Sequence, residues 1–133
     1  IIPLPTSSRR VKMASIRYMV DDVDAAVAFY TARLGFEVND HRGAPFASIQ
    51  KGDLTLWLAG PGSSAARPMP DGRQPGPGGW NRLVLEVTDI VAVVEDLRAH
   101  GVAFRNVIVT GPGGKQIVCE DPSGNPIEVF QPA

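Results

Sequence analysis

The chain has 133 residues, of which 44% are hydrophobic and 20% charged, and its formal net charge is −1. This length fits one domain with a single core, and the near-neutral charge disfavours nucleic acid as a partner. No apolar stretch approaches the ~20 residues that cross a bilayer, so no membrane partner is expected. Cys119 is the only cysteine, which excludes an internal disulfide and favours a reducing, cytoplasmic location.

Residues 1–12 form an N-terminal arm or leader rich in Pro, Ser and Arg. They lack the continuous apolar core of a signal peptide. We take Met13 as the natural start and expect residues 13–133 to form a single domain, to which the arm contributes little.

An internal repeat organises the domain. The motif Val-x-Asp-Val at residues 20–23 recurs as Val-x-Asp-Ile at residues 87–90, 67 positions later. The glycines that follow each motif, Gly35 and Gly101, lie 66 positions apart. Self-similarity at a fixed spacing indicates one supersecondary unit used twice.

Each unit begins with a strand and continues with a helix. Residues 15–20 and 82–87 alternate in polarity, which predicts a sheet with two different faces. Asp22 and Asp89 are good N-caps for the apolar residues at helical spacing that follow, and the two glycines named above are natural C-terminal caps.

Three short strands are expected after each helix, separated by turns rich in Gly, Pro, Asn and Asp. Each module is then βαβββ, and the fold class is α+β, with curved mixed sheets around a cleft. The modules span residues 13–59 and 80–133. The expected strands lie near residues 36–40, 46–50 and 54–59 in the first module and near 104–109, 115–120 and 127–130 in the second.

The segment at residues 60–79 joins the modules and is rich in Pro and Gly. Irregular connections of this length inside a compact domain are usually either functional lids or plain linkers. The linker interpretation is simpler, because two modules must be joined, and the lid interpretation stays open.

Two segments carry a family resemblance. Residues 20–30 with Leu34-Gly35-Phe36, and residues 121–130 (Asp-Pro-Ser-Gly-Asn-Pro-Ile-Glu-Val-Phe), resemble the opening and closing motifs of the vicinal oxygen chelate superfamily, the glyoxalase, bleomycin resistance protein and extradiol dioxygenase group. The resemblance covers about residues 14–132 and implies the fold. It implies function only weakly, because the group includes isomerases, dioxygenases, epimerases, thiol transferases and drug-sequestering proteins. It also implies a homodimer, with the cleft within a chain or across the interface.

The resemblance further implies where a metal would lie. Enzymes of the group hold a divalent metal with four side chains, usually His and Glu, two from each module. Carried onto this sequence, these positions are Ser15, Trp57, Arg82 and Glu128. Only Glu128 is a good ligand, because serine binds metals poorly, tryptophan not at all, and arginine is a permanent cation.

We therefore expect no metal cofactor and hypothesise that Arg82 and Glu128 form an ion pair where a metal would lie. The alternative is that both side chains simply face solvent in an open cleft.

Two tryptophans are expected on the cleft face. Trp57 and Trp80 could sandwich a planar or apolar ligand, or they could instead pack a module or dimer interface. Further ligand-binding residues are expected around them: Met19, Phe46 and Phe130 as apolar lining, Arg17 and Arg82 as positive charge for a carboxylate, phenolate or enolate, and the carboxylates Glu86 and Glu128, of which Glu86 could also be a second partner for Arg82.

Three other residues have testable environments. His41 is either an exposed loop residue or a general base over the cleft. His100 is expected in a helix C-terminal turn. Cys119 follows Ile117-Val118 and is expected to be a buried structural thiol rather than a nucleophile.

Three functions remain open at this point. The first is binding of a small aromatic or apolar molecule without a metal, as in drug or metabolite sequestration. The second is a metal-dependent lyase, isomerase or dioxygenase with shifted ligands, for example His41, Glu86 and Glu128. The third is metal-free acid/base catalysis by Arg82, Glu128 and His41, so the sequence leaves open whether the protein is an enzyme.

Overall fold

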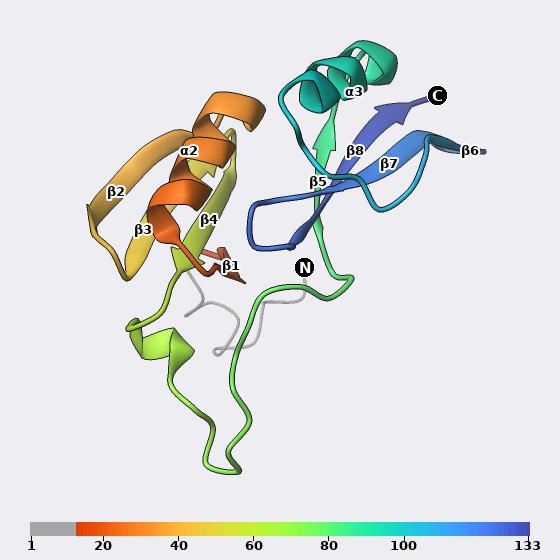
Figure 1. The fold of residues 1–133 in the computed structure, drawn as a ribbon. Helices are drawn as coiled ribbons and strands as arrows, with labels where there is room; N and C mark the ends of the chain where they lie inside the picture. The colour runs from red at the N-terminus through yellow and green to blue at the C-terminus, as the bar shows by residue number, and fades with distance from the viewer. Residues whose placement is uncertain (1–12) are drawn as a thin grey trace, which may run out of the picture.

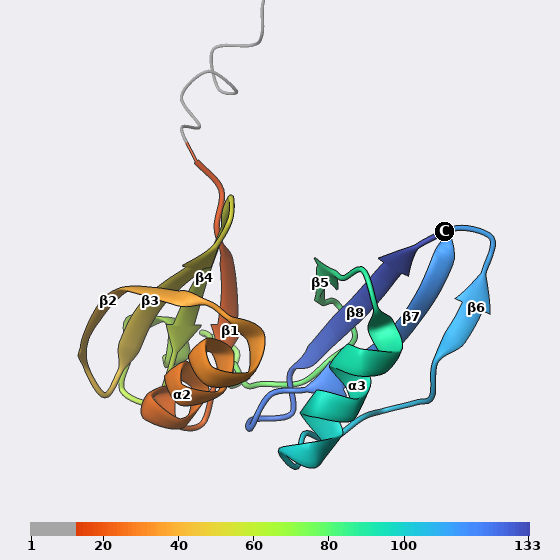
Figure 2. The same cartoon turned by 90° about the horizontal axis from the view of Figure 1, so that it is seen from above.

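A computed structural model describes residues 13–133, and the arm at residues 1–12 lies outside the described residues. The described chain forms two four-stranded mixed sheets side by side, each carrying one helix (Figures 1 and 2). This confirms the α+β class and the two βαβββ modules. No helix in residues 13–133 is long and apolar enough to span a membrane.

The first module has the sheet order β1-β4-β3-β2 and the second the order β5-β8-β7-β6. The elements of the first module are β1 (Ile16–Met19), α2 (Val23–Leu34), β2 (Glu37–Gly43), β3 (Phe46–Lys51) and β4 (Leu54–Ala59). Those of the second are β5 (Leu83–Glu86), α3 (Ile90–Ala99), β6 (Val109–Gly111), β7 (Gly114–Glu120) and β8 (Pro126–Pro132), and a short 3₁₀ helix, Ser64–Ala66, lies in the connection between them.

Both helices begin and end as their sequences predict. The Oδ1 atoms of Asp22 and Asp89 accept the N–H groups of Ala25 and Ala92 at 3.0 and 3.1 Å, which satisfies donors that a helix start leaves unpaired. At the C-terminal ends, Gly35 and Gly101 adopt φ angles of 74° and 79°, a left-handed conformation that glycine adopts without strain.

The strand register shows that the sequence repeat is a structural repeat. Parallel pairing aligns Ile16 with Leu56 in the first module and Leu83 with Ile127 in the second. Ile16 and Leu83 are 67 positions apart, as in the repeat. One residue further along, Trp57 and Glu128 therefore occupy equivalent positions on the two sheets.

The core lies between each sheet and its helix. The side chains that alternate toward α2 or α3 are buried, and those on the opposite sheet face are more exposed. Fully buried large residues include Tyr30, Ile49, Leu56, Leu58, Ile90, Leu97, Ile117 and Ile127. Burying such side chains supplies most of the driving force for folding.

The predicted strand at residues 104–109 is wrong in extent. Strand β6 begins only at Val109, and before it Phe104 forms a single bridge to Cys119. The reason is local: Oδ1 of Asn106 accepts the N–H of Val118 at 2.9 Å, in place of a backbone carbonyl. A side chain that competes in this way interrupts the strand ladder. The turn predicted between this strand and the next is confirmed and forms a hairpin, since Gly111 pairs with Gly114 in the antiparallel β6–β7 pair.

The turn before β8 holds the two modules together. The carboxylate of Asp121, 5% exposed, accepts the hydroxyl of Tyr30 on α2 at 2.8 Å. The hydroxyl of Tyr18 on β1 donates to the carbonyl of Pro126 at 2.9 Å and accepts the N–H of Leu83 at 3.0 Å. The Asn125 amide donates to the carbonyl of Met19 at 2.7 Å. Side chains of the first module are thus bonded directly to the closing motif of the second.

The connection at residues 60–79 extends away from both sheets (Figure 1). It is tied at its two ends: the N–H of Gly60 donates to the carbonyl of Pro45 at 2.9 Å, and that of Gly78 donates to Oδ1 of Asn125 at 2.8 Å. These bonds set where the connection leaves β4 and where it approaches β5.

Tyr30→Phe tests the module junction. The variant removes the hydroxyl that donates to Asp121 and leaves this buried carboxylate with one hydrogen-bond donor fewer. We expect the free energy of unfolding to fall by about 1–3 kcal/mol in urea denaturation. The control is Thr31→Val, which removes a hydroxyl bonded only within α2 and should change stability by about 0.5 kcal/mol or less. Equal effects of the two variants would show that the Tyr30–Asp121 bond is not a special link between modules.

Candidate functional site

Arg82 and Glu128 form the ion pair expected from the sequence. Nε and Nη2 of Arg82 lie 3.0 and 2.9 Å from Oε1 of Glu128. The Arg82 side chain is 26% exposed and that of Glu128 11%. The alternative, that both groups face solvent unpaired, is therefore wrong. Because the pair is largely desolvated, each charge depends on the other.

Aromatic and cationic side chains cluster on the open face of the first sheet. The guanidinium carbon of Arg17 lies 5.0 Å from the centre of the Trp57 ring, and the Phe46 ring meets Trp57 edge-on at 6.0 Å. Arg17 lies opposite Trp57 in the β1–β4 pairing, so neighbouring strands bring the two together. Trp57 keeps 37% of its surface exposed.

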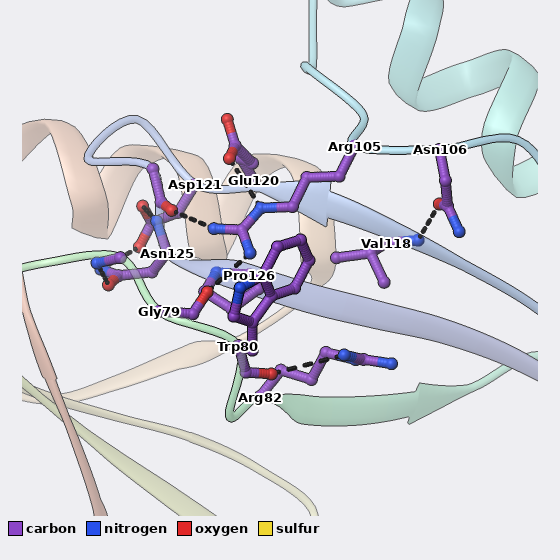
Figure 3. A network of polar contacts seen from close by, with 12 residues as sticks. Gly79, Trp80, Arg82, Arg105, Asn106, Val118, Glu120, Asp121, Asn125 and Pro126 are labelled. Atoms are coloured by element: carbon purple, nitrogen blue, oxygen red, sulfur yellow. Dashed lines mark hydrogen bonds and ion pairs between the residues drawn. The ribbon is translucent and has the colours of Figure 1, made fainter.

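A second indole with an arginine lies at the end of the connection (Figure 3). The guanidinium of Arg105 lies 4.6 Å from the centre of the Trp80 ring. It also donates to Oε2 of Glu120 at 2.8 Å and to the carbonyls of Gly79 and Gly124 at 2.6 and 2.9 Å. Arg105 thereby holds Trp80 in place while the indole remains 70% exposed.

Arg105 was not among the residues expected at the site. Arg105 follows the core-packed Phe104 but lies in no strand, so strand alternation gives little indication of where its side chain lies. Nothing in the sequence indicates which arginine meets Trp80, because the pairing depends on Glu120, 15 residues away, and on the path of the connection.

Only some of the predicted ligand-binding residues share one cavity. Arg17, Met19 and Arg82 line a groove of about 410 Å³, called here the β1–linker groove, whose other lining residues include Gly76, Gly78 and Asn81. Phe46, Trp57, Trp80, Glu128 and Phe130 lie outside it. Phe130 is half-buried on β8. Ligand binding by these residues stays a prediction.

The structure does not pair Glu86 with Arg82. Among the described residues, the carboxylate that Arg82 contacts is Glu128. Glu86 is exposed and lines a different groove, with Val93 and Asp96 of α3. The expectation that Glu86 is a second ion-pair partner is therefore wrong, because it is the last residue of β5, where the chain turns toward α3.

His41 does not reach the Arg82–Glu128 pair. It lies on β2, and its Nε2 is 2.8 Å from Oδ1 of Asp24 in the first turn of α2. The register between β2 and β3 shifts around Asp40, and His41 lies on the side of the sheet that carries α2. The proposed set of His41, Glu86 and Glu128 is thus not assembled in one chain, and His41 is no general base for the pair. His100 is the C-cap of α3, at the helix end where it was expected, with Nδ1 2.8 Å from the Asp96 carbonyl.

The residues at the family's metal positions do not fit a divalent ion. Ser15, Trp57 and Arg82 offer at most one weak neutral oxygen, and the guanidinium of Arg82 engages Glu128. Within residues 13–133, no group of three or more His, Cys, Asp or Glu side chains is placed to hold a metal.

Cys119 is a buried thiol, as expected. It is free and 0% exposed, and burial raises its pKa to about 12. A thiol of this kind carries almost no thiolate near neutral pH and is a poor nucleophile.

Comparisons with known proteins agree with this architecture. The model of the Glyoxalase/Bleomycin resistance protein/Dioxygenase superfamily matches residues 12–129. The chain belongs to this superfamily. No curated protein matches it.

Solved structures show the same fold over nearly the whole chain. A superfamily member from Sphaerobacter thermophilus is 25% identical with a TM-score of 0.71, covering 92% of this chain and 98% of that one. TnmS3, an antibiotic binding protein from Streptomyces sp. CB03234, is 26% identical with a TM-score of 0.66, at the same coverage. A lactoylglutathione lyase from Agrobacterium tumefaciens is 22% identical with a TM-score of 0.70, covering 92% and 93%, and shows the fold alone.

Arg82→Met tests the energetics of the ion pair. The variant leaves Glu128 nearly buried without its partner, so we expect a loss of about 2–4 kcal/mol in the free energy of unfolding. The double variant Arg82→Met/Glu128→Leu should recover most of that loss, because it strands no charge. The control is Arg42→Met, which breaks an exposed pair with Asp40 and should cost about 0.5 kcal/mol or less. A double variant as unstable as the sum of its single variants would contradict the coupling.

Cys119 should resist thiol reagents in the native protein. At pH 8 we expect Ellman's reagent to label it at least about 100-fold more slowly than in denaturant, since labelling requires local opening. Because the folded pKa of the thiol is raised from an ordinary value near 9.0, the stability linked to it is complete below pH 9 and is lost as pH rises toward 12. Rapid native labelling would show that the thiol is accessible.

Proposed function

We propose that this protein binds a small aromatic or apolar molecule on the open sheet faces without using a metal centre, in the manner of a drug- or metabolite-sequestering protein. The observation that carries the proposal is the Arg82–Glu128 pair. It places a permanent cation at one metal position of the family and engages the surviving carboxylate. This pairing argues against a metal-dependent reaction and in favour of ligand binding.

The aromatic groups supply the binding surface. Trp57 and Trp80 are both substantially exposed, and each has an arginine against its ring. Such cation–π contacts hold an indole in one orientation, which lowers the entropy that a ligand must remove on stacking. An oriented, exposed indole is suited to a planar ligand.

The similarity to TnmS3, described as an antibiotic binding protein, supports binding rather than turnover. The lactoylglutathione lyase shares only the fold at its level of identity and does not extend its activity to this chain. His41, the histidine considered for acid/base catalysis with the Arg82–Glu128 pair, contacts Asp24 instead.

We further propose that the functional unit is a homodimer in a reducing, cytoplasmic location. Apolar side chains are exposed in the second module, among them Val84 on β5 at 49% and Val107 in the segment before β6 at 70%. Exposed apolar surface of this kind is suited to cover by a second copy. Light scattering coupled to gel filtration tests the dimer, and a monomer at micromolar concentration would contradict it.

Tryptophan fluorescence tests the binding role. Variants Trp57→Phe and Trp80→Phe each retain one reporter, and titration with a panel of aromatic antibiotics and aromatic metabolites should quench the emission saturably. Trp57→Ala should weaken binding of any hit by about tenfold, as expected for loss of a stacking partner, whereas Val91→Ala on exposed α3 should not. Absence of quenching by every panel member, together with turnover of a diketone or catechol, would overturn the proposal.

Metal analysis tests the other half of the proposal. We expect purified protein to contain no stoichiometric Zn, Ni, Fe or Mn, and calorimetric titration with these ions to show no specific binding. Tight binding of one equivalent that is lost in Glu128→Gln would show that the ion pair yields to a metal.

A further inference from the structure

Positive charge lines the β1–linker groove. Arg17 lies on β1 and Arg82 directly before β5, and among residues 13–133 no Asp or Glu lines this groove. Two other grooves of the molecule mix both signs: one has Arg33 with Asp121, the other Lys51 with Asp96. The sign of the charge therefore distinguishes the β1–linker groove.

The charge of Arg17 is not neutralised within the described residues. Its one described interaction there is the contact with the Trp57 ring, and no carboxylate pairs with it. Arg82 is paired with Glu128, so the two arginines and one carboxylate leave a net charge of +1 beside the groove.

Donors for an anion remain available. A guanidinium has five N–H groups. Arg82 directs three of them at protein acceptors: Nε and Nη2 at Glu128 and Nη1 at the carbonyl of Trp80. One N–H on each Nη remains. Asn81 is exposed and its amide has no described bond. Asn125, by contrast, is hydrogen-bonded to Met19, Gly78 and Asp121. Its side chain therefore forms part of the groove wall.

From this geometry we infer that the ligand of the proposed function is a planar aromatic acid whose carboxylate binds in the β1–linker groove between Arg17 and Arg82. This inference rests on the proposed binding role and narrows it to an anionic ligand class. Because Arg17 contacts both the groove and Trp57, it joins the site for the charged group to the site for the ring. Planar guanidinium groups are well matched to carboxylates.

A matched pair of probes tests the inference. We would measure by calorimetry the dissociation constants of 2-naphthoate and the neutral 2-naphthamide, which share ring and shape. Wild-type protein should bind the carboxylate about 10- to 100-fold more tightly, the range expected for a hydrogen bond to a charged group. Arg17→Gln should abolish this preference, Arg17→Lys should restore part of it, and Arg42→Gln, which removes an exposed arginine on β2, should leave it unchanged.

The ratio of the two constants is the readout, so a change in Trp57 packing that weakens both probes does not affect it. Equal binding of acid and amide, or a preference retained in Arg17→Gln, would overturn the anionic class while leaving the binding function intact. Failure of both probes to bind would also overturn the inference. The binding function itself falls only if the wider aromatic panel fails as well.

Discussion

The buried carboxylate of Asp121 is the interaction on which the arrangement of the two modules depends. It accepts hydrogen bonds from the Tyr30 hydroxyl, the N–H groups of Ser123 and Asn125, and the Asn125 amide. Burial and this carboxylate raise the pKa of the Tyr30 phenol, so the hydroxyl remains a donor. A buried charge is tolerated when it is satisfied in this way. The resulting turn bonds to β1, which places Arg17 and Arg82 around one groove.

Arginine has a different role at each aromatic or acidic partner on the open faces. Arg17 contacts Trp57, Arg105 contacts Trp80 and neutralises Glu120, and Arg82 neutralises Glu128. Lysine could not replace these residues equally, because planar stacking and several directed donors come together only in a guanidinium. On these faces the guanidinium groups are therefore oriented by their aromatic and acidic partners.

The repeat and strand alternation made part of the site predictable, because they fix the position and face of a residue within each module. The Arg82–Glu128 pair was expected because the family resemblance, carried onto this chain through the equivalence of residues 15 and 82 and the closing motif, places both residues at metal positions. Three placements were not predictable. Strand β6 is shortened by the Asn106 side chain, His41 is drawn to Asp24 across an irregular stretch of β2, and Arg105 meets Trp80 only through the path of the connection. Each depends on a side chain competing with regular backbone geometry.

The sequence by itself determined the two βαβββ modules, their caps and the buried face of each sheet. These properties are local or periodic, so neighbouring residues specify them. Only the tertiary structure decided which open-face residues meet: that Arg17 shares a groove with Arg82, that Glu86 turns away from it, and that Trp80 rests on Arg105. These contacts join segments far apart in the chain, and they depend on how the Asp121 turn packs against α2 and β1.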